Sequence, residues 1–261
     1  MSRTVGLVVP AFRPDVDALS SYVRALHERL PVETIRIELD DPLPGTADAL
    51  ADCPATVNAV AARRGKGAAI TAGFEALDAD VLAFADADGS TPPTSIGAVL
   101  DSVLGGRAAL GVGSRRHPDA TVEAHQTLAR RRLGDAFAWL ARRLLAVSLT
   151  DYQCGAKAID ADAWRAVRDH LCEPGFAWDV ELIALVDALG YRIEEVPVTW
   201  RDDPESTVSP LATASELAGA LVRSRHRAKL IRGDRVHAAI ATRTPTRVPL
   251  TDRLGADPTD D

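Results

Sequence analysis

Residues 81–89 read VLAFADADG, an apolar run of five residues that ends directly in Asp-Ala-Asp-Gly. A short and continuously apolar run is typical of a buried strand in a parallel sheet, because helices cover both faces of such a sheet. Ligands of these sheets bind at the carboxyl ends of the strands, which is where Asp86 and Asp88 fall. The stretch therefore predicts an α/β fold and marks the edge of the sheet at which a functional site is expected.

The chain on both sides of this stretch alternates between predicted strands and predicted helices. A further apolar run predicts a strand at residues 5–9, and other short strands are predicted at 35–39, 56–59 and 110–113. Apolar residues three and four positions apart predict helices over residues 16–30, 67–77 and 96–104. Elements that alternate through short links build a mostly parallel twisted sheet flanked by helices. At 261 residues, the chain suits one large α/β domain better than two small ones.

The second half of the chain is less regular. It shows a strand pattern over residues 193–200 and helical patterns over residues 133–144, 179–189 and 213–231. From residue 238 onward the sequence is rich in Thr, Pro and Asp, a composition that favours disorder. We therefore expect a folded domain over residues 1–237 and a disordered tail over residues 238–261.

The composition excludes several classes of function. A formal net charge of -7 argues against general nucleic-acid binding, which requires a basic surface. The three cysteines lack metal-type spacing, so a zinc site or a disulfide framework is not expected and a reducing cytosol is the default. No apolar run approaches the ~18 residues that span a bilayer, and residues 1–4 lack the apolar stretch of a signal peptide. The expected location is the cytoplasm, in solution or at the cytoplasmic face of a membrane.

Asp86 and Asp88 are the first candidate site residues. Strand alternation relaxes beyond the last bonds of a sheet, so both carboxylates can point into one crevice. Crowded carboxylates repel each other unless a cation lies between them. Mg²⁺ or Mn²⁺ meets this need, because it takes one or two protein carboxylates and completes its shell with phosphate oxygens and water. The Asp-x-Asp pattern alone is weak, and a solvated loop with helix-capping aspartates is the alternative.

Two other polar clusters lie near predicted strand ends or helix starts. The RRGKG run at residues 63–67 precedes a predicted helix, and glycines, cations and a helix N-terminus together favour phosphate binding. A plain surface turn explains this run equally well. Asp40 and Asp41 end the second predicted strand, where they either cap a turn or contact a nucleoside.

Eight stretches of the chain carry a resemblance to a known family. In chain order they are VVPAF (8–12), DD (40–41), RGKG (64–67), DADG (86–89), GSR (113–115), DYQCGAK (151–157), FAWDVEL (176–182) and VPVTW (196–200). The chain resembles the family 2 glycosyltransferases, which have the Rossmann-like GT-A fold, and most closely the dolichyl- or polyprenyl-phosphate hexose synthases. The resemblance covers about residues 5 to 210. One such motif is a weak signal, but eight in the family's order are a specific one.

The resemblance implies roles for the donor side of the site. It implies that Asp86 and Asp88 hold the metal and the diphosphate, with Asp88 also counted as catalytic. The residues expected to contact the nucleotide or the donor sugar are Pro10, Phe12, Asp40, Asp41, Lys66, Gln153, Lys157, Asp179 and Glu181.

The acceptor side follows from the same resemblance. Arg115 is expected to meet the acceptor phosphate, and the nearby arginines Arg131 and Arg132 are expected to assist it. Arg201 and Ser206 are expected on a loop that closes over the diphosphate. Asp151 and Lys157 complete the expected catalytic set with Asp88 and Arg115.

The resulting expectation is a metal-dependent, inverting hexosyl transfer from a nucleotide sugar to polyprenyl or dolichyl phosphate. UDP-glucose is favoured as donor, and GDP-mannose is the competitor. A phosphate acceptor is already anionic near neutral pH and requires no strong base, whereas an alcohol acceptor requires a carboxylate base, for which Asp151 or Asp179 are the candidates. The alternatives are a glycosyltransferase with a soluble acceptor and a non-catalytic relative that binds nucleotide sugars. Membrane contact is expected through a partner protein, through residues 213–232 or through the arginine-rich run 130–143.

Overall fold

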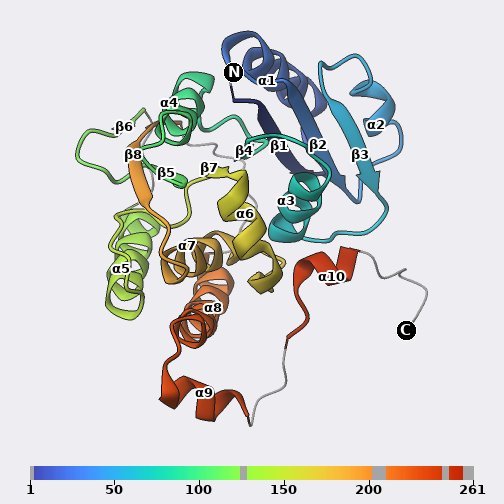
Figure 1. The fold of residues 1–261 in the computed structure, drawn as a ribbon. Helices are drawn as coiled ribbons and strands as arrows, with labels where there is room; N and C mark the ends of the chain where they lie inside the picture. Colours follow the sequence, from blue (N-terminus) through green and yellow to red (C-terminus); the bar gives the residue numbers. More distant parts are fainter. Residues whose placement is uncertain (1–2, 124–127, 202–209, 243–246, 255–261) are drawn as a thin grey trace.

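The computed structural model describes residues 3–123, 128–201, 210–242 and 247–254 (Figure 1), and it describes the backbone alone at 128–133 and 210–216. A seven-stranded mixed sheet lies at the centre, in the order β3-β2-β1-β4-β7-β5-β8. Its strands are β1 (Val5–Phe12), β2 (Thr34–Asp40), β3 (Thr56–Val60), β4 (Val81–Ala85), β5 (Leu110–Ser114), β7 (Ala156–Asp160) and β8 (Ile193–Pro197). A separate pair joins β6 (Thr121–Val122) to β9 (Thr199–Trp200).

Helices cover both faces of this sheet (Figure 1). In chain order they are α1 (Val16–Arg29), α2 (Thr46–Ala49), α3 (Lys66–Glu75), α4 (Pro93–Leu104), α5 (Leu128–Leu144), α6 (Ala161–Val167), η1 (Arg168–His170), α7 (Trp178–Ala188), α8 (Pro210–Ile231), α9 (Arg235–Ala241) and α10 (Leu250–Leu254). The mostly parallel α/β fold predicted from the sequence is confirmed.

Two hydrophobic cores lie on the two faces of the sheet, because successive side chains of a strand point to opposite faces. In β4, Ala83 and Ala85 enter the core beneath α1 and α4, while Leu82 and Phe84 enter the core that contains α3 and α7. Phe84 packs edge-on against Trp178 at 5.8 Å between ring centroids. The β4 strand is therefore buried on both sides, as its continuous apolar run predicts.

The β7 strand runs antiparallel to both of its neighbours, β4 and β5. The sequence analysis did not predict this strand, since Lys157 interrupts its apolar pattern. The antiparallel direction has a consequence for the site, because it brings the start of β7 to the carboxyl ends of β4 and β5. Ala85 pairs with Ala156, and Val112 pairs with Lys157.

The C-terminal segment differs in part from its predicted disorder. Helix α9 occupies residues 235–241, and α10 packs against the domain through Leu250, whose side chain is buried. The Leu250 amide donates to the Leu171 carbonyl at 2.8 Å. Residues 243–246 and 255–261 of the predicted tail lie outside the described residues. Within the described ranges, every helix is too short or too polar to cross a lipid bilayer.

Candidate active site

The Asp-Ala-Asp-Gly motif forms a tight turn directly after β4. The Asp86 amide donates to the Gly155 carbonyl at 3.0 Å, which ties the turn to the start of β7. Gly89 has a φ of 66°, a left-handed conformation that glycine adopts without strain. The Ser90 amide donates to Asp88 Oδ1 at 2.9 Å. Both carboxylates thus lie at the carboxyl end of the central strand, as the sequence predicted.

Asp86 is fixed by an ion pair and by a close backbone. Its Oδ1 atom lies 2.8 Å from Lys66 Nζ, at the N-terminus of α3. Its Oδ2 atom lies where a Cβ on residue 155 would stand, so only glycine fits beside it. The close approach of Asp86 therefore explains, on steric grounds, why the DYQCGAK stretch has glycine at position 155.

A chain of alternating charges continues inward from Asp86. Lys66 Nζ lies 3.2 Å from Asp179 Oδ2, and Lys157 Nζ lies 2.6 Å from Asp179 Oδ1. Burial alone would lower the pKa of Lys66, but the charges of Asp179 and Asp86 raise that pKa above its ordinary value. Lys66 therefore remains a cation in the crevice, and Asp179 is its buried counter-charge.

Asp40 holds the loop that presents Lys66. Asp40 Oδ2 accepts from the amides of Arg64 and Gly65 at 2.7 and 3.0 Å, and Asp40 Oδ1 accepts from Arg64 Nε at 2.8 Å. Asp40 is 3% exposed, so its carboxylate faces this loop and not the open crevice. Of the Asp40 and Asp41 pair, the structure assigns to Asp40 the loop-positioning role.

Arg115 and Asp151 form a second charged centre, at the end of β5. Arg115 Nε and Nη2 donate to Asp151 Oδ2 and Oδ1 at 2.6 and 3.0 Å. Burial would raise the pKa of Asp151, but the charge and hydrogen bonds of Arg115 hold that pKa well below its usual range. The Arg115 side chain is 23% exposed, so this guanidinium is anchored on one edge and reaches solvent on the other.

The two centres surround one buried residue. Cys154 is 0% exposed, and its thiol senses the charges of Asp151, Arg115, Lys157 and Asp86. Burial, followed by the charge of Asp151, raises the pKa of Cys154 to about 12. Cys154 is therefore a neutral packing residue, and no thiolate chemistry is assigned to it.

The donor atoms at Asp86 and Asp88 fit a hard divalent cation. Partial desolvation raises the pKa of Asp88, and the charge of Asp86 raises it further. A cation between the two carboxylates relieves both effects. Among the described residues, no group of three or more His, Cys, Asp and Glu side chains could hold a metal ion. The pair is thus a partial ligand set of the kind that phosphate oxygens and water complete.

Phe12 and Asp41 lie at the carboxyl ends of β1 and β2, the strands next to β4 on one side of the sheet. Phe12 ends β1 and is 39% exposed, with the Arg63 guanidinium 4.0 Å from its ring centroid. Asp41 Oδ2 accepts from Arg13 Nη2 at 2.7 Å. Pro10 lies two residues before Phe12 in β1 and pairs with Glu38 of β2. A flat aromatic ring and a carboxylate at a strand end suit a nucleobase.

The predicted acceptor residues are described only in part. The Arg201 amide donates to the Ser90 carbonyl at 2.9 Å, which brings residue 201 beside the turn with Asp88. Its guanidinium is exposed and pairs with Glu123 at 2.5 Å. Arg131 and Arg132 belong to α5, but their side chains lie outside the described part, as does the whole of Ser206.

Glu181 does not join the crevice, contrary to the expectation from the sequence. It is 0% exposed, and its Oε2 accepts from the Cys172 and Glu173 amides at 2.9 and 2.7 Å. Its Oε1 pairs with Arg227 of α8. The reason is helical geometry: two residues along a helix turn the side chain by ~200°, so Asp179 and Glu181 face opposite ways. Gln153 lies near the site, because its backbone amide donates to Asp151 Oδ1 at 3.0 Å.

Several supporting residues were missed by the sequence reasoning. Gly67 approaches Trp178 so closely that a Cβ would overlap the indole. Tyr22 Oη donates to the Thr91 carbonyl at 2.7 Å and lies beneath Gly89. Tyr22 belongs to the apolar stripe of α1, so its pattern indicated only core packing. The glycine at 67 was visible in the sequence, but its packing partner is 111 residues away.

Comparisons with known proteins agree with this geometry. The family model described as "Glycosyl transferase family 2" matches residues 39–163. The chain is 31% identical over 214 residues to an undecaprenyl-phosphate mannosyltransferase of Micrococcus luteus, covering 77% of this chain and 86% of that protein. It is 27% identical to the glycosyltransferase AglD of Haloferax volcanii, over 84% of this chain. It is 29% identical to a dolichyl-phosphate beta-glucosyltransferase of Dictyostelium discoideum, over 63% of this chain. The chain spans 36% of AglD and 51% of the Dictyostelium protein.

Solved structures confirm the fold. Glucosyl-3-phosphoglycerate synthase from Mycobacterium tuberculosis superposes with a TM-score of 0.65 at 18% identity, covering 85% of this chain and 80% of that one. Mannosyl-3-phosphoglycerate synthase from Rubrobacter xylanophilus gives a TM-score of 0.65 at 20% identity, with 89% and 76% covered. The predicted GT-A fold and the predicted enzyme class are confirmed. The chain belongs to glycosyltransferase family 2.

Proposed function

We propose that this chain transfers a hexose from a nucleotide sugar to the phosphate of polyprenyl or dolichyl phosphate, with inversion at the anomeric carbon. The observation that carries the proposal is the pair of charged centres around Cys154. Lys66 with Asp86 forms one, and Arg115 with Asp151 forms the other. A transfer between two phosphate-bearing substrates needs two cationic positions, one for the leaving diphosphate and one for the acceptor.

Each centre has a distinct action in the reaction. The Lys66 ammonium, held between Asp86 and Asp179, stabilises the negative charge that develops on the leaving diphosphate. Arg115 orients the acceptor phosphate with the guanidinium edge that Asp151 does not occupy. Asp86 and Asp88 would hold Mg²⁺ or Mn²⁺, which supplies further charge neutralisation at the diphosphate. Solved structures of glucosyl-3-phosphoglycerate synthase contain UDP together with Mn²⁺ or Mg²⁺.

A phosphate acceptor agrees with the state of the carboxylates. A general base works best with a pKa near the operating pH. The pKa of Asp151 is held far below that range by Arg115, and Asp179 is enclosed by two lysines. Neither carboxylate suits the deprotonation of an alcohol. A phosphate, whose second pKa is about 6, is already a nucleophile.

UDP-glucose is our favoured donor, and GDP-mannose is the competitor. Relatives with both sugars in their names match the chain: dolichyl-phosphate beta-glucosyltransferases and an undecaprenyl-phosphate mannosyltransferase. The acceptor assignment rests on the same relatives, whose names specify dolichyl or undecaprenyl phosphate. We place the reaction at the cytoplasmic face of a membrane, with peripheral attachment through a partner protein, α8 or the arginine-rich α5.

The test is a donor and acceptor panel with the full chain and Mn²⁺ or Mg²⁺. We expect glucose transfer from UDP-glucose to a short-chain polyprenyl phosphate, detected as a lipid-linked sugar by mass spectrometry. Removal of the divalent ion with EDTA should abolish turnover, and its return should restore it. The Asp88→Asn variant should lose about 10³-fold in turnover at an unchanged melting temperature.

The same panel separates the alternatives. Exclusive transfer from GDP-mannose would overturn the donor assignment and keep the acceptor. Transfer only to a soluble phosphate ester such as 3-phosphoglycerate would overturn the lipid acceptor. Tight nucleotide binding without transfer to any acceptor would indicate a non-catalytic relative.

A further inference from the structure

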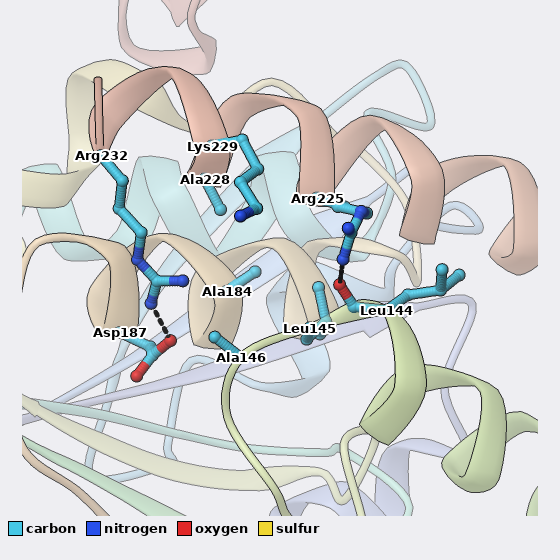
Figure 2. A pocket seen from close by; sticks show the side chains of 9 residues that line it. All are labelled: Leu144, Leu145, Ala146, Ala184, Asp187, Arg225, Ala228, Lys229 and Arg232. Atoms are coloured by element: carbon cyan, nitrogen blue, oxygen red, sulfur yellow. Dashed lines mark hydrogen bonds and ion pairs between the residues drawn. The ribbon is translucent and has the colours of Figure 1, made fainter. Parts of the chain in front are cut away.

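A solvent-open hollow of about 100 Å³ lies between the end of α5, α7 and α8, away from the crevice (Figure 2). Its lining residues are Leu144, Leu145, Ala146, Ala184, Asp187, Arg225, Ala228, Lys229 and Arg232. Helix α7 carries Asp179 of the crevice in its first turn and Asp187 of the hollow in its last. Eight residues of helix separate them, a rise of about 12 Å. The hollow is therefore a separate place on the molecule.

Small side chains create the empty space. Ala146 follows α5, Ala184 belongs to α7 and Ala228 belongs to α8, so each wall contributes an alanine. Figure 2 shows Ala184 and Ala146 below the longer side chains of α8, and Ala228 beside Lys229 on α8 itself. A floor of methyl groups leaves the polar character of the hollow to its cations.

Three cations line the hollow from one helix. Arg225, Lys229 and Arg232 are spaced at i, i+4 and i+7, which places them on one stripe of α8. Arg225 donates to the Leu144 carbonyl, and Arg232 pairs with Asp187. Lys229 Nζ lies 3.6 Å from Asp234 Oδ2, beyond hydrogen-bond distance. The three positive charges of the lining thus face two carboxylates, Asp187 within the lining and Asp234 beside it.

Lys229 is distinctive in this sequence. The chain contains 27 arginines and only three lysines, at 66, 157 and 229. The first two lie in the crevice, where their ammonium groups pair with Asp86 and Asp179. An ammonium is a compact point charge with three rotatable donors, and in this form lysine binds phosphate groups. The third lysine is the one whose ammonium enters the hollow in Figure 2.

We propose that this hollow is a second anion site, which binds the phosphate group of a phosphate ester. Lys229 and Arg225 donate to the phosphate oxygens, Arg232 contributes charge, and the alanine floor receives the organic part of the ester. Two sources share this chemistry: a soluble phosphate monoester, and the head group of an anionic phospholipid. The inference is independent of the sugar donor and acceptor proposed above.

The test reads Lys229 directly. Reductive methylation with formaldehyde and cyanoborohydride, followed by peptide mass spectrometry, gives the labelling rate of this lysine alone, without any transfer assay. We expect glycerol phosphate to slow the labelling of Lys229 at least fivefold with saturation, while chloride at equal ionic strength leaves the rate unchanged. Equal slowing by chloride, or no slowing by either soluble ester or vesicles, would overturn the proposal.

Vesicles distinguish the two sources. Protection by glycerol phosphate in solution identifies a soluble ester. Protection by phosphatidylglycerol vesicles, with none from phosphatidylcholine vesicles and none from glycerol phosphate, identifies a lipid head group.

Variants separate a built site from general electrostatics. The Arg232→Gln change should weaken protection about tenfold, whereas Arg235→Gln, which removes the same charge from the exposed start of α9, should not change it. The Asp187→Asn change removes the competing carboxylate and should tighten binding severalfold, a gain that a structural role does not predict. Equal effects of Arg232→Gln and Arg235→Gln would contradict the site, with melting temperatures confirming that each variant is folded.

Discussion

Helix α7 separates two charge clusters that are built in different ways. The crevice cluster consists of Asp86, Lys66, Asp179 and Lys157. The arginine cluster consists of Glu173, Glu181, Arg223, Arg227 and Arg247. Asp179 and Glu181 lie two positions apart on α7, yet each belongs to a different cluster.

The cations of the two clusters differ in kind. The crevice uses lysines, whose ammonium groups have no fixed orientation and can exchange a protein carboxylate for a ligand phosphate. The arginine cluster uses guanidinium forks: Arg223 Nε and Nη2 donate to Glu173 Oε1 and Oε2 at 2.7 and 2.9 Å. Forks of this type fix geometry. The comparison assigns ligand exchange to the first cluster and scaffolding to the second.

The two clusters are nevertheless mechanically connected. Glu173 precedes Pro174, whose carbonyl accepts from the Ala68 amide at 3.0 Å. Ala68 follows the Lys66-Gly67 pair at the start of α3, and a Cβ at Gly67 would overlap the Glu173 carbonyl. The arginine cluster therefore holds the loop that supports Lys66. If the assignment is right, changes in the first cluster reduce turnover, and changes in the second reduce stability.

The largest expected effect is that of Lys66→Met on turnover. This change leaves Asp86 and Asp179 without their shared cation and removes the charge that we propose for the leaving diphosphate. We expect turnover to fall by about 10²-fold or more, measured as initial rates at saturating donor. The matched control is Arg247→Met, which removes a cation from the arginine cluster and should leave the turnover of the folded enzyme within twofold. A large loss in Arg247→Met would contradict the division of roles.

The next largest effect is that of Glu181→Ala on stability. The change removes the acceptor of the Cys172 and Glu173 amides and leaves Arg227, 17% exposed, with Glu173 as its remaining carboxylate partner. A buried amide left without an acceptor costs about 1–3 kcal/mol, which urea denaturation should show as a lower unfolding free energy. Arg227→Met in the same background should recover part of the loss. A turnover loss as large as that of Lys66→Met would place Glu181 back in the crevice.

The first half of the fold follows from local pattern. Continuous apolar runs predict β1 and β4 within a few residues, because strands buried on both faces need little else to specify them. The antiparallel β7 does not follow, since Lys157 interrupts its run and its neighbours in the sheet are distant in sequence. The hydrophobic pattern within one segment does not indicate whether its strand runs parallel or antiparallel to its neighbours.

The residues of the candidate site also fall into two groups, those that local pattern predicts and those that it does not. Asp86, Asp88 and Arg115 are predictable because they end strands, and strand ends of parallel sheets converge. Glu181 was placed wrongly because a motif names residue types but not the side of the helix that each one faces. The partners of Glu173 lie 50 and 74 residues away, at Arg223 and Arg247, so pairing at this distance leaves no mark in the sequence.

A smaller effect is expected on the loss of folding stability at acid pH. Burial would raise the pKa of Glu173, but hydrogen bonds and charge from Arg223 and Arg227 lower it below its ordinary value. A lowered folded-state pKa contributes stability above the unfolded value, about 4.5, and this contribution is lost as pH falls through the folded value. Glu173→Gln should remove this contribution at pH 7. Urea midpoints at pH 7 and pH 3.5 should therefore differ less in the variant than in the parent chain.

The smallest expected effect lies at the carboxyl ends of β1 and β2, outside both clusters. Phe12→Ala removes an exposed ring that suits stacking with a nucleobase, and should weaken UDP and GDP binding alike by about fivefold, close to 1 kcal/mol. Every base has a stacking face, so this residue does not choose between donors. Val236 is also an exposed apolar residue, but it lies on α9, so Val236→Ala is the control and should leave binding unchanged.

Choice between the bases needs a directional partner, and Asp41 is the carboxylate directly after β2. A carboxylate can accept two N–H groups from guanine but only one from uracil. Asp41→Asn should therefore change the ratio of UDP to GDP affinity in calorimetric titration by about threefold, while Phe12→Ala leaves the ratio constant. If Asp41→Asn also leaves the ratio constant, the base is recognised elsewhere, and Asp41 serves only to hold Arg13.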